Sequence, residues 1–413
     1  MNLRVQAAIR SVHPIYVIAI MMTKSAFQGA FFYRGKVMKK NICILIMPTD
    51  QCNMNCVYCY HTPHYESVNG EIMSISTLDN IFKKTIPHFE HVDFLWHGGE
   101  PLIAGLDFYR KAVELQKKYA GNTCTVTNKM QTNCILAEGE LLDFLVRENF
   151  SFGTSLDGIT NDLSRGNTDL ILQGINNIKN SDKSCNSILV FTSLNCDLMI
   201  ECYEYFKEKE ISFKFNHYID TTHDEISRKL SVDIKHYLCN QKKFFDYWLF
   251  DTNCNIRVTT FFVYLEYILF KRKILGKYNS CLGKWLGVRH NGDIVQCNRY
   301  NNSYYGNINE IEKITDAFQS EGFKYILEKA ISRRNKCQES CDVYDFCQGG
   351  CVVEASHEYG IETIGNFSCT ETKEMYTYIK KSIEKILENY DEFRTELNPT
   401  VVNCIDQYLS KKI

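Results

Sequence analysis

The stretch that decides the fold is residues 41–60, which read NICILIMPTDQCNMNCVYCY. Its first part, residues 41–48, is a short apolar run and predicts a strand buried inside a sheet. Cys52, Cys56 and Cys59 follow directly in the spacing C-x3-C-x2-C, and Tyr60 comes next. A buried strand that leads into a cysteine loop predicts that the chemistry lies at the carboxyl edge of a sheet.

Three thiolates this close can hold three irons of a cubane cluster, because thiolates are the usual ligands of iron–sulfur centres. The fourth iron then stays open to a small molecule, whereas ferredoxins close it with a fourth cysteine. A tetrahedral zinc site would also need a fourth ligand, and the flanking residues offer none. The remaining alternative is three buried structural cysteines.

Downstream of the cysteine loop, β-rich runs alternate with helical patterns. We expect strands at 41–48, 92–96, 125–132, 151–156, 187–194 and 212–218, with helices at 76–89, 106–119, 138–148, 168–179 and 198–209. Six β–α repeats predict an α/β fold, a parallel sheet curled into a partial (β/α)6 barrel with helices outside. Active sites of such barrels lie on the loops that follow the strands.

Composition narrows the function classes. The chain has 413 residues, 45% of them hydrophobic, and a net charge of −2, so neither disorder nor electrostatic binding of nucleic acid or anionic membrane is expected. Its 19 cysteines are closely spaced, which fits metal ligation in the reducing cytoplasm better than disulfides. Residues 1–37 carry basic residues around a short apolar patch; we expect this extension to lie outside the working fold, which would start near Met38.

A second cysteine-rich region spans residues 278–370, where glycines increase and helical periodicity fades. Its seven cysteines are Cys281, Cys297, Cys337, Cys341, Cys347, Cys351 and Cys369. So many cysteines in under about a hundred residues indicate metal binding, either as iron–sulfur clusters or as zinc in two knuckles.

The cysteine loop resembles the signature of radical S-adenosylmethionine (SAM) enzymes. The resemblance implies that a [4Fe–4S] cluster binds SAM and splits it to a radical that removes a hydrogen atom from the substrate. Three further motifs lie at expected strand ends: GGEP at 98–101, QTN at 131–133 and SLDG at 155–158. By resemblance, the residues expected at the SAM site are Gly98, Gly99, Glu100, Asn133, Ser155, Arg165 and Tyr60. Ordinary turn and capping chemistry is the alternative for the last two motifs.

The second region resembles the SPASM domain, which implies two auxiliary [4Fe–4S] clusters. The resemblance assigns one cluster to Cys281, Cys297 and Cys351, and the other to Cys337, Cys341, Cys347 and Cys369. The spacing between Cys337 and Cys341 is one residue longer than the family's usual spacing. Only three ligands are apparent for the first cluster, and Cys254 and Cys404 are the cysteines that could close it.

The predicted organisation is an extension at 1–37, the partial barrel at 38–222, a helical connection at 223–277, the SPASM domain at 278–370 and C-terminal helices at 371–413. The order of motifs is similar to anaerobic sulfatase-maturing enzymes, which form formylglycine, and to maturases that cross-link ribosomally made peptides. In the former a carboxylate base stands in a segment like F-D-x-L-x-E, and the matching position here is Phe262. We therefore expect oxidative cross-linking of a precursor peptide or protein, with formylglycine formation as the alternative.

The resemblance further implies an electron donor such as flavodoxin or ferredoxin, and no nucleic-acid or membrane partner. A hypothesis of a different class, an iron–sulfur carrier or zinc scaffold without enzymatic activity, stands beside these. The catalytic base is not assigned.

Overall fold

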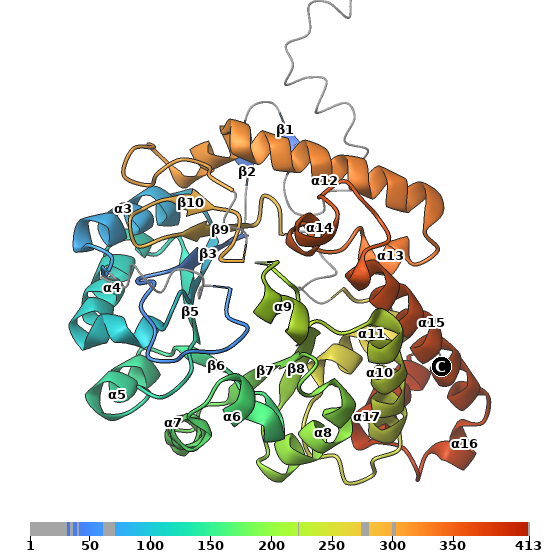
Figure 1. The fold of residues 1–413 in the computed structure, drawn as a ribbon. Coiled ribbons are helices and arrows are strands. Elements are labelled where there is room, and N and C mark those ends of the chain that lie inside the picture. The colour runs from blue at the N-terminus through green and yellow to red at the C-terminus, as the bar shows by residue number, and fades with distance from the viewer. Residues whose placement is uncertain are drawn as a thin grey trace, which may run out of the picture.

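The computed structural model describes residues 31–33, 36–38, 41–60, 71–221, 223–273, 281–299 and 303–411. An eight-stranded sheet forms its centre, in the order β10-β9-β3-β4-β5-β6-β7-β8 (Figure 1). The strands are β3 Asn41–Ile46, β4 His91–Trp96, β5 Thr125–Gln131, β6 Ser151–Ser155, β7 Cys185–Phe191, β8 Phe213–His217, β9 Trp285–Val288 and β10 Ile294–Val295. The six strands from β3 to β8 are parallel, as the sequence predicts.

Helices connect these strands at nearly the expected positions. They are α3 Ile75–Thr85, α4 Gly105–Ala120, α5 Gly139–Arg147, α6 Asn161–Ser164, α7 Thr168–Asn180 and α8 Met199–Glu208. Short 3-10 turns supplement them at Ile86–His88, Pro101–Ala104, Gly158–Thr160 and Cys196–Leu198. The sheet is not closed, because β8 and β10 are its two ends. The prediction of a partial barrel is therefore confirmed.

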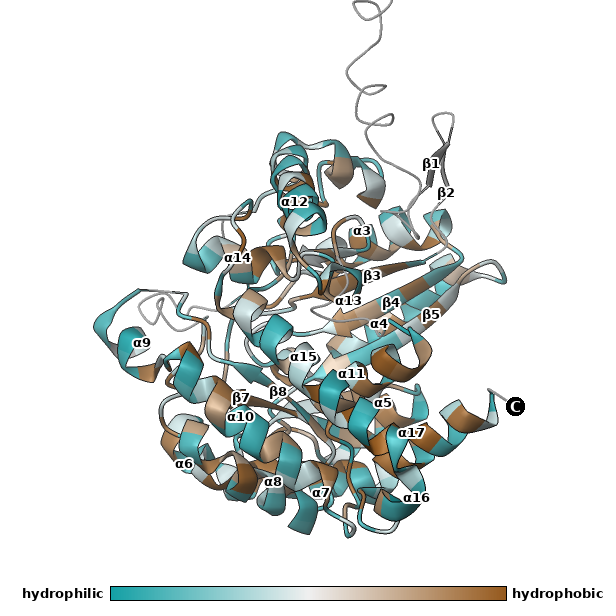
Figure 2. Cartoon of the chain, turned by 90° about the vertical axis from the view of Figure 1, so that its right-hand side faces the viewer, coloured by the Kyte–Doolittle hydropathy of each residue, from teal (hydrophilic) through white to brown (hydrophobic). Residues whose placement is uncertain are grey.

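The first strands show why this sheet forms. Every residue of β3 after Asn41 is buried, and β4 alternates half-buried and buried positions. Hydrophobic colour runs along β3 and β4 in Figure 2, whereas β5 is largely hydrophilic. On the buried face, the Trp96 ring packs edge-on against Phe82, Phe108 and Tyr109. This aromatic cluster fixes α3 and α4 against the strand that ends at the GGEP motif.

The remaining helices are α9 Glu225–Leu230, α10 Ile234–Leu249, α11 Thr259–Phe270, α12 Glu321–Ser340, α13 Tyr344–Cys347, α14 Val352–Glu358, α15 Phe367–Glu388, α16 Tyr390–Phe393 and α17 Pro399–Ser410, with a 3-10 turn at Ile314–Gln319. The aromatic residues of α10 and α11 pack in the core, for example Phe244, Trp248 and Phe261. Within the described chain, no helix has the length and apolar character needed to cross a membrane.

The cysteine-rich region joins the main sheet. Strand β9 pairs in parallel with β3, from Cys43 opposite Trp285 to Ile46 opposite Val288. Strands β1 Phe31–Tyr33 and β2 Lys36–Met38, in contrast, pair with each other in a separate two-stranded sheet. Residues 1–30 lie outside the described residues, so the expectation about the N-terminal extension stays a prediction.

One expectation for this region is wrong, because helical periodicity does not fade throughout residues 278–370. Helix α12 has 20 residues and lies along the top of the molecule in Figure 1. Its buried positions, Phe323, Ile326, Ala330, Arg333 and Cys337, follow the three-and-four spacing of a helix face. Two of them are an arginine and a cysteine, so the buried face does not read as hydrophobic in the sequence.

Candidate SAM and iron–sulfur sites

The cysteine loop leaves the carboxyl end of β3 and is fixed by backbone contacts. Cys52 is exposed, Cys56 is buried and Cys59 is intermediate. The Cys59 N–H donates to the Cys56 carbonyl at 3.1 Å, and the Val57 N–H donates to the Ser164 carbonyl at 2.9 Å. The second bond joins the loop to the segment after β6, which carries the SLDG motif.

Asp157 of the SLDG motif connects these two segments. It is fully buried, and its Oδ2 accepts from the Tyr58 hydroxyl at 2.5 Å, the Ser164 hydroxyl at 2.6 Å and the Arg165 Nε at 3.2 Å. Its Oδ1 accepts from the Val190 N–H at 3.1 Å. Asp157 was not among the expected SAM contacts, although it belongs to a quoted motif. In the fold it holds the residues that do reach the cysteines.

Arg165 is the cation beside the cysteine loop. Its Nη1 lies 3.9 Å from the Cys56 Sγ, and its guanidinium lies over the Tyr58 ring, 5.1 Å from the ring centre. Burial raises the pKa of the Cys56 thiol, while the charge of Arg165 lowers it. A thiolate at this position is therefore stabilised by one fixed positive charge.

The GGEP motif packs directly on the cysteine loop. A Cβ on Gly98 would lie 2.6 Å from the Thr49 carbonyl oxygen, and one on Gly99 would lie 2.1 Å from the Gln51 carbonyl oxygen. The Gly99 N–H donates to the Thr49 carbonyl at 3.1 Å, and the Glu100 N–H donates to the Gln51 carbonyl at 2.7 Å. Only glycines permit this close approach.

The Glu100 carboxylate is buried and accepts from donors of the protein itself. Its Oε1 accepts from the Leu102 N–H at 2.9 Å and the Thr132 hydroxyl at 2.8 Å, and its Oε2 accepts from the Asn133 N–H at 2.8 Å. Burial raises the pKa of Glu100 to about 7, and these three hydrogen bonds oppose that rise. The side chain thus joins the loop after β4 to the loop after β5.

Asn133 and Ser155 stand at the same carboxyl edge. The Asn133 Nδ2 donates to the Asn53 Oδ1 in the cysteine loop at 2.6 Å, and its Oδ1 accepts from the Ile135 N–H at 3.0 Å. The second bond is ordinary turn chemistry. The Ser155 hydroxyl accepts from the Gln131 Nε2 at 3.1 Å. The expected SAM residues thus converge on one edge of the sheet.

Tyr60 connects the cysteine loop to the cysteine-rich region. Its hydroxyl accepts a short hydrogen bond from the Asn298 Nδ2, and Asn298 directly follows Cys297. The same amide lies 3.3 Å from both ring nitrogens of His97, the residue before the GGEP motif. Neither His97 nor Asn298 was predicted from the sequence as a site residue. His97 directly precedes the GGEP motif and Asn298 directly follows Cys297, and this adjacency was the available signal.

The seven cysteines of residues 281–369 fall into two sets of electrostatic neighbours. Burial, together with the charges of Cys351 and Cys297, raises the pKa of Cys281 to about 12. In the other group, burial and the charges of Cys369, Cys337 and Cys341 raise the pKa of Cys347 to about 12. Buried thiols gathered in this way become thiolates only when cations lie among them. This set of donors fits a metal cluster.

Neither candidate fourth cysteine belongs to the first group. The Cys254 Sγ donates to the Ile256 carbonyl at 3.1 Å, and Cys404 lies near Glu266 and Arg257. Among the described residues, no group of three or more histidine, cysteine, aspartate or glutamate side chains is arranged to hold a metal ion.

Phe262, the position that the sequence compares with a catalytic carboxylate, does not lie near the cysteine loop in the fold. Phe262 stands in the first turn of α11, which follows Val258, and Val258 pairs with Phe213 at the amino end of β8. The cysteine loop follows the carboxyl end of β3, so the two lie at opposite edges of the parallel sheet. The Arg257 guanidinium covers the Phe262 ring at 3.5 Å.

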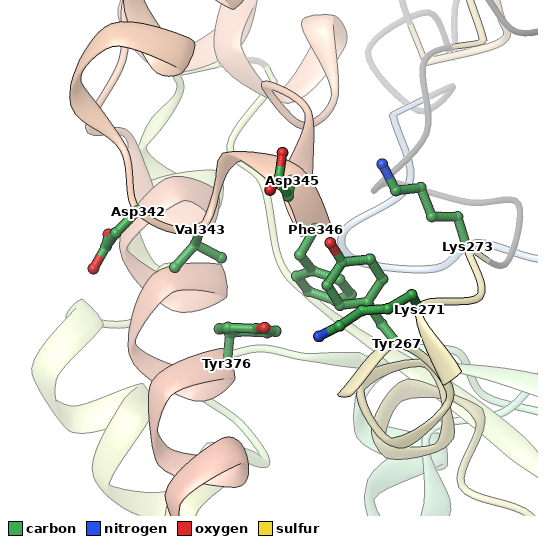
Figure 3. Close-up of a pocket in the computed structure, with 8 residues that line it drawn as sticks. All are labelled: Tyr267, Lys271, Lys273, Asp342, Val343, Asp345, Phe346 and Tyr376. Atoms are coloured by element: carbon green, nitrogen blue, oxygen red, sulfur yellow. The ribbon is translucent and has the colours of Figure 1, made fainter. Parts of the chain in front are cut away.

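A separate pocket of about 420 Å³ lies beside the second cysteine group (Figure 3). The Phe346 and Tyr376 rings stack 5.1 Å apart on one side, and the Lys271 Nζ lies 5.1 Å from the Tyr267 ring centre. Its wall includes Val343, which lies between two cysteines of the group. The pocket is thus distinct from the edge of the sheet that carries the SAM residues.

Comparisons with known proteins agree with this geometry. Residues 46–206 match the family model of the radical SAM superfamily. The chain is 26% identical over 370 residues to the cysteine-type anaerobic sulfatase-maturating enzyme of Clostridium perfringens, covering 84% of this chain and 98% of that protein. The structure of native anSMEcpe with bound AdoMet and Cp18Cys peptide has a TM-score of 0.73 at 26% identity, covering 85% of this chain and 99% of that one.

Streptococcus suis SuiB bound to its precursor peptide SuiA shares the fold, with a TM-score of 0.57 at 18% identity over 80% of this chain and 76% of that one. Because that identity is low, the likeness supports the architecture alone. The match to the superfamily covers the strands and loops that gather the cysteine, GGEP, QTN and SLDG motifs. The chain therefore contains a radical SAM domain at residues 46–206, and it is similar over most of its length to the anaerobic sulfatase-maturating enzymes.

Proposed function

We propose that this enzyme oxidises a side chain of a bound peptide or protein by two electrons. One observation carries the proposal: Tyr60, His97 and Asn298 meet where the cysteine loop adjoins the first auxiliary cysteine group. A side chain bound at this junction would face both sites at once. When bound, SAM and its [4Fe–4S] cluster supply the radical that removes a hydrogen atom from the substrate.

The residues present suit the SAM site. We propose that Cys52, Cys56 and Cys59 hold the cluster, with Arg165 as the neighbouring positive charge. The Glu100 carboxylate already accepts three hydrogen bonds inside the protein. Its main role is then to position the loops that bind SAM, and one lone pair of Oε2 remains for the SAM amino group.

The two auxiliary cysteine groups would hold further clusters, as the resemblance implies. The first group has three cysteines, since Cys254 and Cys404 lie elsewhere. Because Asn298 directly follows Cys297, a substrate bound at the junction would lie beside this group.

Formylglycine formation is the first candidate outcome, because the similarity to a sulfatase-maturating enzyme extends over 84% of this chain. In that reaction a cysteine loses two hydrogens to form a thioaldehyde, which water converts to an aldehyde with release of hydrogen sulfide. A serine would lose two hydrogens and give the aldehyde directly. The relatives' names thus favour the alternative over the cross-linking that the sequence reading preferred.

Cross-linking is the second candidate, favoured by Asn298. This residue is an amide and cannot take a proton from a thiol or alcohol, so the junction is less suited to deprotonating a free cysteine or serine. A cross-link would also remove two hydrogens, one as an atom and one as a proton with loss of an electron. The two outcomes therefore differ in whether an aldehyde forms.

The test uses iron-loaded enzyme, SAM, a reductant, and short sulfatase peptides that carry either cysteine or serine. Production of 5′-deoxyadenosine with an aldehyde-reactive product supports formylglycine formation. A product lacking two hydrogens but inert to aldehyde reagents supports cross-linking. Product that gains oxygen without losing hydrogen contradicts both outcomes, and no 5′-deoxyadenosine from iron-loaded protein would leave only the carrier or scaffold hypothesis.

A further inference from the structure

Arg333 is a buried guanidinium that contacts the second cysteine group. It lies on α12, one turn before Cys337, and is only 2% exposed. Its Nε donates to the Gly349 carbonyl at 2.6 Å, and its Nη2 lies 3.0 Å from the Cys369 Sγ. Its Nη1 is buried and has no hydrogen-bond partner. Together with Cys347 and Cys369, the side chain lines a small cavity.

No described carboxylate forms an ion pair with Arg333. Its charge does reach Glu358, whose pKa it lowers against the larger effect of burial. Glu358, however, accepts from the Phe367 N–H at 2.7 Å. A buried charge is normally paired, because leaving it uncompensated is costly. The Arg333 Nη2 instead contacts the Cys369 Sγ, and its side chain shares the small cavity with Cys347 and with Glu354, whose carboxylate pairs with Arg299.

The arginines beside the other two cysteine groups differ in this respect. Arg165 near Cys56 is paired with Asp157 at 3.2 Å. Arg299, whose Nη2 lies 3.6 Å from the Cys351 Sγ, has the Glu354 carboxylate 3.6 Å from its Nη1. In both cases a carboxylate lies close enough to offset part of the positive charge. Of the three arginines whose guanidinium contacts a cysteine Sγ of these groups, Arg333 is the one without a carboxylate partner among the described residues.

We propose that Arg333 is the built-in counter-charge of the cluster held by Cys337, Cys341, Cys347 and Cys369, and that it sets the reduction potential of that cluster. The inference rests on the auxiliary clusters of the proposed function. Net charge and hydrogen bonds to sulfur both tune iron–sulfur potentials. A nearby positive charge stabilises the added electron, so Arg333 raises the potential.

The test compares reconstituted holoenzymes by redox titration followed by electron paramagnetic resonance, without peptide. Arg333→Gln should lower one midpoint potential by about 59 mV or more, equivalent to a tenfold change in the one-electron equilibrium. Arg333→Lys keeps the charge and should retain most of the potential. Lys329→Gln is the matched control, since it removes a charge from the surface of the same helix, where Lys329 pairs with Glu362; it should leave all potentials in place.

An Arg333→Gln potential equal to that of the control overturns the inference. If Arg333→Gln loses four irons while Arg333→Lys keeps them, the result supports Arg333 as the counter-charge of this cluster. If both variants lose four irons, that role is refuted. Absence of the second auxiliary signal from the unaltered enzyme would overturn the cluster assignment as well. An unshifted signal in Arg333→Gln contradicts this inference alone, because the titration does not depend on peptide oxidation.

Discussion

Asp157→Asn removes the charge from a carboxylate that serves four donors at once. Three of them, the Tyr58 hydroxyl, the Ser164 hydroxyl and the Arg165 Nε, share one oxygen, and the Val190 N–H uses the other. An asparagine can keep the three hydrogen bonds that its side-chain oxygen accepts. Its NH2 group would then face the Val190 N–H, so that two donors oppose each other. The Arg165 side chain, 11% exposed, keeps its charge and loses its carboxylate.

The structure gives the expected size of the effect. Breaking a buried ion pair by removing one partner costs about 3–5 kcal/mol, and the lost neutral hydrogen bond adds about 1 kcal/mol. A loss of this size should lower the melting temperature by on the order of 10 °C. SAM should also bind more weakly, because Tyr58 and Arg165 hold the cysteine loop in place. Thermal melting and SAM titration of the reconstituted enzyme measure the two effects.

Two further variants make the experiment decisive. Asp169→Asn removes an exposed acidic residue from the nearby helix α7 and should change the melting temperature only slightly. The double variant Asp157→Asn/Arg165→Gln removes both charges and should be more stable than Asp157→Asn alone, because no unpaired charge stays buried. The reasoning is refuted if Asp157→Asn has the same melting temperature as the Asp169→Asn control. It is also refuted if the double variant is no more stable than Asp157→Asn.

Three more predictions concern the cysteines and Glu100. Replacing the three loop cysteines by alanine should abolish 5′-deoxyadenosine formation yet leave iron on the protein, because seven other cysteines form separate groups; soluble protein without iron would contradict this. Burial raises the pKa of Glu100 from 4.5 to about 7, so the folded state binds this proton more tightly than the unfolded chain. The contribution of Glu100 to the free energy of unfolding should therefore fall by roughly 3 kcal/mol as pH rises across that interval. Glu100→Gln should remove this pH dependence of the free energy of unfolding, measured by denaturant titration at several pH values. If that free energy changes with pH equally in both proteins, the shift is refuted. Cys254→Ala and Cys404→Ala should each leave the iron content unchanged, and a loss of iron in either variant would make that cysteine a ligand.

The barrel could be predicted from the sequence because its signals are local. The six parallel strands are short apolar or alternating runs, and each is followed by a helical pattern of ordinary length. The observed boundaries differ from the predicted ones by a few residues, as at β7, which begins at Cys185 where residue 187 was expected. Helix α12 could not be found in this way, because its buried face includes Arg333 and Cys337.

Only those residues of the candidate site that belong to sequence motifs could be predicted. Cysteine spacing and the GGEP motif predicted residues that meet at one edge of the sheet, but the sequence could not tell which of their side chains form hydrogen bonds within the protein. Asp157 and Glu100 are both buried, at 0% and 1% exposure. That burial depends on contacts between segments that belong to different strands, which spacing along the chain does not encode. The contact between Tyr60 and Asn298 joins residues 238 positions apart and is equally invisible.

The Glu100 and Asp157 carboxylates suggest how the loops at the candidate SAM site are held in fixed positions relative to one another. Each loop follows a different parallel strand, and no ladder of backbone hydrogen bonds continues beyond the strand ends. Glu100 joins the loops after β4 and β5, and Asp157 joins the loops after β3 and β6 to strand β7. A carboxylate suits this task because it accepts several hydrogen bonds and offers no donor to compete for them. A motif carboxylate can therefore be essential for SAM binding while making most of its hydrogen bonds to the protein, so activity loss alone cannot identify a SAM ligand in this family. Only a variant that weakens SAM binding at unchanged stability identifies a direct contact.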